Sequence, residues 1–391
     1  MSGPLSRYFD FYLACAQMAE PLYTVSCVPE VEVDFGAGPR RFARSTRVLN
    51  LGPGDGGPVS AEGSVDWSQL DKFPACVTVE WSGAARGIVD ALARRPGIQF
   101  LYWDDASGDI DLTATRLGTV RLDGARLRSV RLPESVTSLF PRRPPATLRV
   151  DAPDSGRRLD LRLFQYGPDV VVPDGLQGVP KLWLWVGGTI SAGALAKLTG
   201  LEELTITFGD PPGVITDLNE FIALARLRSL QFDSAYGLDP SKLPELPSLR
   251  RIHLEGTSRT IAAAAKARFT GGGVEVTVSG AKSEAWLAAH MHNPFRGWVE
   301  DSESFAAAAC EAYAGAVRAI EAIESGTTEG GDAAERILRR FGADLNAIES
   351  EYGLIDTDYR EQAWDVFRGL AERAHVPAQQ ASQWFDDDRR F

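Results

Sequence analysis

Cysteine is scarce in this sequence, and the spacing of the few that occur excludes a disulfide framework. The 391 residues contain four, none in a C-x-x-C pair: Cys15, Cys27, Cys76 and Cys310. Small secreted domains stabilised by disulfides are far richer in cysteine. We therefore expect a protein of the reducing cytoplasm.

Long hydrophobic runs are missing as well. No stretch of about 18 residues is apolar and free of charge, as a membrane-spanning helix requires. The opening segment "MSGPLSRYFDFYLACAQMAE" contains Arg7, Asp10 and no uninterrupted apolar run, so we read no signal peptide there. The sequence thus predicts a cytoplasmic protein that does not enter a membrane.

Motifs for catalysis and nucleotide binding are absent from the sequence. It has no G-x-x-x-x-G-K-[ST], no G-x-G-x-x-G after a strand and no G-x-S-x-G. Among four histidines, His290 and His292 lie two residues apart, and on a helix such side chains point about 200° apart. They could share a metal only on an extended segment. We expect no metal, no cofactor and no catalytic residue.

A basic surplus is also missing. The net charge of −12 argues against nucleic-acid binding, which needs a positive surface. The acidity is uneven, because residues 281–391 hold 21 acidic and 11 basic residues. The same segment is rich in Ala and Glu at helical spacing, which predicts an acidic α-helical module there.

What the sequence does contain is an apolar repeat. The spacing L-x-x-L-x-L recurs in "VPKLWLWVGG", "LEELTITFGD", "LRSLQFDS" and "LRRIHLEG", and its last apolar position falls at 184, 206, 232 and 254. These intervals fall within the roughly 20–29 residues of one coil of a strand-plus-return solenoid. Upstream, "LGTVRL", "LRSVRL" and "TLRVDA" carry a similar spacing at positions 122, 132 and 150, where the steps are irregular.

The stretch from about Leu117 to Gly256 resembles a leucine-rich-repeat protein of an irregular bacterial type. The resemblance implies a horseshoe-shaped α/β solenoid with parallel strands and a concave strand face. Segments such as "ISAGALAKLTG" and "DLNEFIALAR" would form helical returns on the convex side. The sequence departs from the family where an asparagine usually follows the strand, because Gly187, Gly209 and Gly256 stand there instead.

Three parts are expected along the chain. Residues 1–65 would form an irregular N-terminal cap ending in the Gly/Pro-rich linker "GPGDGGPVSAEGS". Residues 66–280 would form the solenoid, closed by the alternating strand "GGGVEVTVSG", and residues 281–391 the helical module. The segment "NPFRGWVED" (293–301) lies between predicted helices, and we interpret its Phe295 and Trp298 as a plug at the junction of the two domains.

Strand alternation predicts which side chains point out of the solenoid. If Leu182 and Leu184 face the core, Trp183 and Trp185 face out. Thr205 and Thr207 follow the same parity, and so do the proposed partner-binding residues Arg121, Arg131, Arg149, Arg162, Gln231, Asp233, Arg251, His253 and Glu255. Trp and Arg are enriched in binding hot spots. The four arginines would then form one ladder beside the tryptophans.

Two explanations of these outward side chains that involve no partner stay open. The helical module could cover Trp185, and the arginines could be a solubilising surface paired with Asp123 and Asp151. With these in view, we favour a non-enzymatic protein that binds a protein partner through its concave face. An immunity-type or regulatory binder, in which the acidic module neutralises a basic partner, is one version of this hypothesis.

The alternative is an enzyme whose site lies where the solenoid meets the helical module. Its candidate residues would be His290, His292, Arg296 and Glu300. Binding of nucleic acid or an acidic ligand along the arginines is disfavoured by the net charge.

Overall fold

The computed structural model describes residues 29–53, 57–165, 167, 169–323 and 328–390. The chain separates into two compact units between Ser283 and Glu284. Each unit is considered by itself below.

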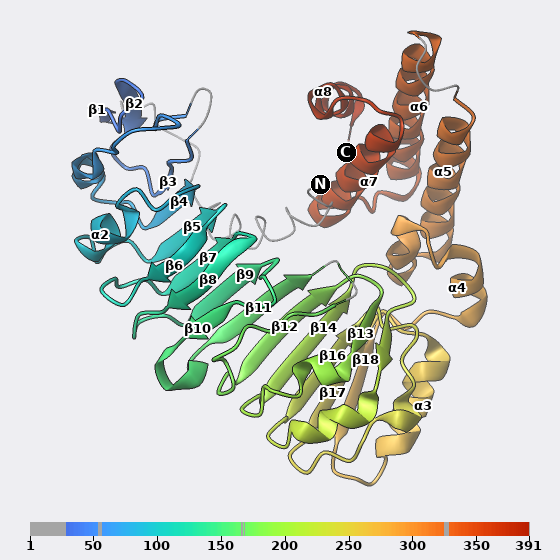
Figure 1. Ribbon diagram of the computed structural model, residues 1–391. Helices are drawn as coiled ribbons and strands as arrows, with labels where there is room; N and C mark the ends of the chain where they lie inside the picture. The colour runs from blue at the N-terminus through green and yellow to red at the C-terminus, as the bar shows by residue number, and fades with distance from the viewer. Residues whose placement is uncertain (1–28, 54–56, 166, 168, 324–327, 391) are drawn as a thin grey trace. The chain divides into compact units, whose positions relative to one another are not determined.

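The first unit is built on one long parallel sheet (Figure 1). Eleven strands pair in chain order, each parallel to its neighbours. They are β3 (Val48–Asn50), β4 (Thr78–Ser82), β5 (Phe100–Asp104), β7 (Thr119–Asp123), β9 (Ser138–Arg142), β11 (Asp160–Gln165), β12 (Lys181–Val186), β14 (Glu203–Phe208), β16 (Ser229–Asp233), β17 (Arg251–Glu255) and β18 (Glu275–Ser279). Because β3 belongs to it, the sheet begins before residue 66, where the sequence had placed its start.

One apolar position per strand aligns across the whole sheet. The paired residues stand at positions 49, 79, 101, 120, 139, 161, 182, 204, 230, 252 and 276. All are leucine, isoleucine or valine, and all but Val276 are buried. Successive side chains of a strand point to opposite faces, so this row lines the core. The repeat is therefore as regular in the first half as in the second.

The irregular steps upstream have a structural cause. A second parallel sheet of β6 (Ser107–Asp111), β8 (Arg126–Arg131) and β10 (Arg149–Asp151) lies across the core from the main sheet. Leu127 and Val130 of β8 are buried in the same core as Val120 and Leu122 of β7. Residues 127–132 carry the apolar spacing of the repeat but do not open a new coil, because they form the return side of the coil that β7 begins.

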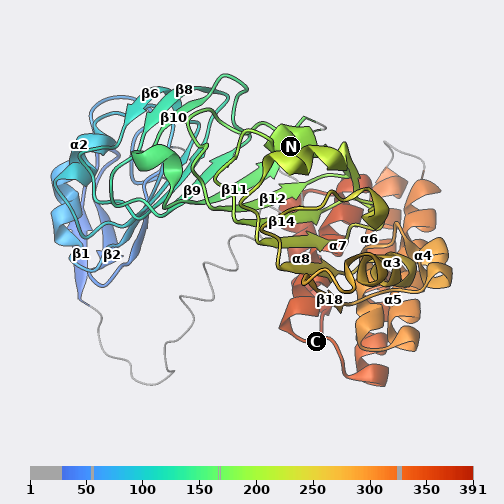
Figure 2. The same ribbon diagram turned by 90° about the horizontal axis from the view of Figure 1, so that it is seen from below.

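The returns between main-sheet strands are short. Two further strands pair in parallel, β13 (Thr189–Ser191) and β15 (Val214–Thr216). The helical turns are η2 (Trp67–Lys72), α2 (Ile88–Ala93), η3 (Pro153–Gly156), η4 (Ala192–Leu195), η5 (Leu218–Ala223), η6 (Pro240–Lys242) and α3 (Arg259–Phe269). The predicted returns at "ISAGALAKLTG" and "DLNEFIALAR" are thus short 3₁₀ helices of four and six residues. Figure 2 shows the coils following one another from the antiparallel hairpin of β1 (Glu30–Val33) and β2 (Arg40–Ala43) to β18.

The second unit is helical, as its composition predicts. Its elements are α4 (Glu284–His290), η7 (Pro294–Glu300), α5 (Glu303–Glu321), α6 (Thr328–Tyr352), α7 (Thr357–Arg373) and α8 (Ala378–Asp388). Ser302 caps α5 by accepting a hydrogen bond from the Phe305 backbone N–H, and Asp356 caps α7 by accepting one from Tyr359.

Aromatic rings form the centre of the helical unit. Phe295 and Trp298 of η7 are fully buried, with their ring centroids 4.4 Å apart. Trp298 stacks on Phe305 of α5 at 4.8 Å, and Phe295 lies 6.2 Å from Phe341 of α6. The interpretation of these two residues as a plug between domains is therefore wrong. They hold η7 against α5 and α6 within one core.

Candidate binding face of the main sheet

The side of the main sheet that points away from its core is called the strand face here. Its central row contains Glu80, Tyr102, Arg121, Phe140, Arg162, Trp183, Thr205, Gln231, His253 and Thr277. A second row, one alternation further along the strands, contains Phe164, Trp185, Thr207, Asp233, Glu255 and Ser279. Residues far apart in sequence are thereby brought side by side.

In the β5 to β12 half of the strand face, aromatic and arginine side chains alternate. The guanidinium carbon of Arg121 lies 4.4 Å from the ring centroid of Tyr102. That of Arg162 lies 5.0 Å from Phe140 and 5.4 Å from Trp183, so it contacts a ring on each side. These distances are typical of cation–π pairs, which fix the arginines in place. Tyr102 is 7% and Phe140 6% exposed.

The two predicted tryptophans point away from the core, as strand alternation requires. Both are half-buried, while the flanking Leu182 and Leu184 are buried. Phe164 of the neighbouring strand stacks against Trp185 and meets Trp183 edge-on, each at 6.4 Å between centroids. The Trp183 indole Nε1–H donates to Thr207 Oγ1 at 3.1 Å. The indoles are therefore held in one orientation.

Polar side chains continue the strand face from β14 to β18. Thr207 donates to Asp233 Oδ2 at 2.7 Å, and Gln231 Nε2 donates to Asp233 Oδ1 at 2.9 Å. The His253 ring lies 2.8 Å from Thr277 Oγ1 and 3.2 Å from Ser279 Oγ, measured from its two nitrogens. This half of the face thus presents an ordered network of donors and acceptors.

A third row at the start of the strands carries charged side chains on β11, β12, β14, β17 and β18. Lys181 pairs with Glu203 at 2.9 Å, and Arg251 lies exposed between Ser229 and Glu275 in the register. With Arg251 and Glu255 added, nine of the eleven predicted partner-binding residues lie on the main sheet.

The other two arginines do not. Arg131 lies on β8 and Arg149 on β10, so the expectation of a single four-arginine ladder is wrong. Arg131 pairs with Asp111 at 2.7 Å and Asp151 at 3.4 Å on the outside of the second sheet. Asp151 is thus one of the two acids expected to pair with the arginines on a solubilising surface. The other acid, Asp123, pairs with Arg143 instead. Of these four arginines, Arg121 and Arg162 belong to the strand face.

Sequence reasoning missed Tyr102, Phe140 and Phe164. The signal was present, because each directly follows a buried leucine of its strand, Leu101, Leu139 or Leu163. The outward position of these three aromatic residues becomes evident only when the register of strands β5 to β11 is known.

The four candidate residues of the alternative enzyme site all lie in the helical unit. The His290 ring lies 4.0 Å from the Trp286 ring at the end of α4, and His292 and Glu300 are exposed. Arg296 Nη1 donates to the Asn293 carbonyl at 3.3 Å.

Two thiols are buried and unreactive in character. Burial raises the pKa of Cys76 to about 11 and that of Cys310 to about 12. Across the described ranges, no cluster of three or more His, Cys, Asp or Glu side chains could hold a metal ion. In the same ranges no helix is both long and apolar enough to cross a bilayer.

Comparison with known proteins gives a limited result. No protein-family model matches the chain, and no curated protein does. Among solved structures, the chain is similar to an internalin C2 from Listeria monocytogenes, with 18% sequence identity and a TM-score of 0.26 over 54% of this chain and 83% of the other.

The repeat itself decides the architecture. Its parallel strands recur about once per solenoid coil, with one buried aliphatic ladder and short returns. The first unit has a leucine-rich-repeat solenoid fold. Glycines stand here where leucine-rich repeats usually have an asparagine. Backbone hydrogen bonds join neighbouring coils at these positions, such as the one that the Gly209 N–H donates to the Val186 carbonyl oxygen at 2.9 Å.

Proposed function

We propose that the protein is a non-enzymatic binder that recognises another protein through the strand face of its solenoid. The observation that carries this proposal is the row of partly exposed Arg121, Arg162 and Trp183, whose arginines are held by the buried rings of Tyr102 and Phe140 on adjacent strands. Tyr, Trp and Arg are the residue types that dominate binding hot spots.

The geometry supports recognition of a folded surface better than capture of a small molecule. A solenoid sheet offers an extended platform, because each coil adds one strand to the same face. Ring contacts hold Arg162 before a partner arrives, so less side-chain entropy is lost on binding. The polar network around Asp233 would supply oriented hydrogen bonds next to the aromatic half.

The test is partner capture from the native host with the full chain, compared by quantitative mass spectrometry. Replacing Trp183 and Trp185 by Ala removes the central anchors and should weaken retention of the partner about 30-fold or more. Ile222→Ala is the matched control, because Ile222 is 66% exposed on η5, away from the strand face.

Two further readings make the result decisive. Circular dichroism must show that the double variant keeps its fold, and a Trp183→Phe, Trp185→Phe variant should keep part of the binding. Equal recovery of every protein by the double Ala variant and the wild type would refute the assignment of this face.

A narrower version of the proposal concerns the acidic helical unit. The net charge of −10 for residues 281–391 would favour a basic partner, as in an immunity-type or regulatory binder. Such binding should weaken steeply as salt rises, since exposed charges are screened. Salt-insensitive capture would remove this version and leave the strand face as proposed.

A further inference from the structure

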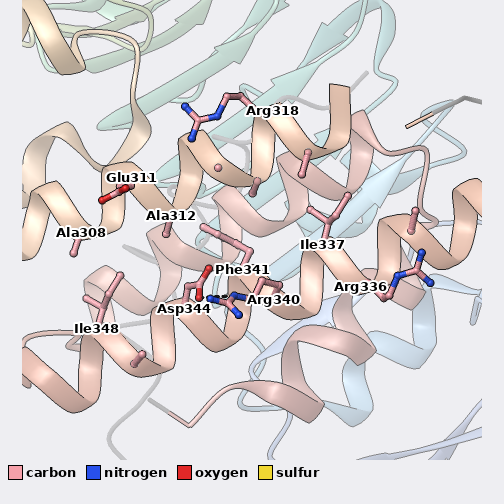
Figure 3. Close-up of a pocket in the computed structure, with 15 residues that line it drawn as sticks. Ala308, Glu311, Ala312, Arg318, Arg336, Ile337, Arg340, Phe341, Asp344 and Ile348 are labelled. Carbon is pink, nitrogen blue, oxygen red and sulfur yellow. Dashed lines mark ion pairs between the residues drawn. The ribbon is translucent and has the colours of Figure 1, made fainter. Parts of the chain in front are cut away.

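A groove runs along the helical unit between α5 and α6 (Figure 3). Its volume is about 860 Å³, and every residue that lines it belongs to one of these two helices. On α6 the lining extends from Ala333 to Ile348, which corresponds to roughly 22 Å or four turns. The groove thus has two helical walls and is long enough to hold a further helix of about four turns.

Small residues on α5 open this space. Ala308, Ala312, Gly315 and Ala319 recur along one side of the helix, so the wall that they form has almost no side chains. On α6 the half-buried Ile337 faces this wall, and the buried Phe341 and Ile348 form the floor between the helices. A groove with one flat wall and an apolar floor fits the apolar face of an amphipathic helix.

Charge at one end of the groove gives it a direction. Arg318 and Arg336 are exposed, and their side chains form no ion pair with any residue that the structure describes. Arg340 is already paired with Asp344 at 2.8 Å, and Glu311 lies toward the other end.

We propose that this groove is a second docking site, which receives an amphipathic α-helix of a protein partner. The bound helix carries small or aliphatic side chains toward Ala312 and Ile337, and carboxylates at the end that meets Arg318 and Arg336. A helix entering with its C-terminal end at these arginines gains further from its dipole. This site is independent of the strand face, so either can fail without the other.

The test uses a phage library of 18-residue helical peptides against the full chain. Positions along one face are varied among Ala, Gly, Ser, Val and Leu, and the positions at both ends among Asp, Glu, Lys and Arg. We expect enrichment of peptides with acidic residues at one end. Synthetic copies of these peptides should bind an Arg318→Glu, Arg336→Glu variant about tenfold more weakly by fluorescence anisotropy.

Matched variants separate groove binding from general charge or folding effects. Ala312→Gln fills the groove and should abolish enrichment, whereas Ala343→Gln on an exposed position of α6 outside the groove should not. Arg373→Glu on α7 changes charge elsewhere in the unit and should leave binding unchanged. The proposal is overturned if no peptide is enriched above the Ala312→Gln bait, or if the enriched peptides bind the double Arg variant as tightly as the wild type.

Discussion

Two glycines at the same place in different coils provide a sharp test of how the solenoid stacks. Gly200 stands directly before Leu201 and four residues before the ladder position Leu204, and Gly97 stands likewise before Ile98 and Leu101. A methyl group at Gly200 would lie 2.7 Å from both the carbonyl carbon and oxygen of Gly178, in the preceding coil. A methyl group at Gly97 would meet no atom within 4 Å.

The two substitutions should therefore differ in sign. Neither glycine has a positive φ, so Ala is compatible with the local backbone at both positions. Gly200→Ala forces two backbones apart, and overpacking of this kind costs about 1–3 kcal/mol. Gly97→Ala only restricts the unfolded chain and should stabilise the protein by about 0.4–1 kcal/mol.

Urea unfolding followed by circular dichroism measures the difference between the variants. With a slope of about 3 kcal/mol per molar urea, Gly200→Ala should unfold at a midpoint roughly 0.3–1 M below the wild type. Gly97→Ala should unfold at or slightly above the wild-type midpoint. Equal midpoints for the two variants, or a more stable Gly200→Ala, would show that the backbones of adjacent coils do not approach each other closely at Gly178 and Gly200.

Two other predictions concern titrating groups. In a Cys15→Ser, Cys27→Ser background, Cys76 and Cys310 should not react with a thiol reagent at pH 8 until the chain is unfolded, because burial raises both pKa values; rapid labelling of the native protein would contradict this. Hydrogen bonds from Ser68 and Gln69 lower the pKa of Asp66. Its ionised form therefore stabilises the fold above the ordinary pKa near 3.8, and this contribution disappears as pH falls through the lowered pKa. The stability gap between wild type and Asp66→Asn should accordingly shrink between pH 6 and pH 3, and a constant gap would argue against the effect.

Much of the fold could be read from the sequence because one local pattern repeats. From β12 to β17 the apolar spacing alone predicted the strands and their inward residues, and the structure places Leu182, Leu204, Leu230 and Ile252 in one ladder. The helical unit was equally readable, since caps such as Ser302 and Asp356 mark helix starts locally. Its central packing was not, because Phe295 and Trp298 meet Phe341 and Phe305 only through tertiary contacts.

The candidate binding face was half predicted for a related reason. Strand alternation placed Trp183 and Trp185 correctly on the outward side, because their strand was recognised. Tyr102 and Phe140 stand on strands whose register the sequence did not reveal, so the aromatic partners of Arg121 and Arg162 were missed. A side chain's direction follows from its strand, but its neighbours follow from which strands are adjacent.

The case of Arg121 and Arg131 shows where local pattern stops being informative. "LGTVRL" and "LRSVRL" have the same apolar spacing, and both arginines precede a buried leucine. Yet Arg121 contacts Tyr102 on the main sheet, and Arg131 pairs with acids on the second sheet. The distance between the motifs decides the outcome, because position 132 follows position 122 too closely to complete a coil, whereas the ladder positions 101, 120 and 139 lie almost twice as far apart. Two equal motifs closer together than one coil must therefore lie on opposite sides of the core, and their outward residues cannot share a partner-binding face.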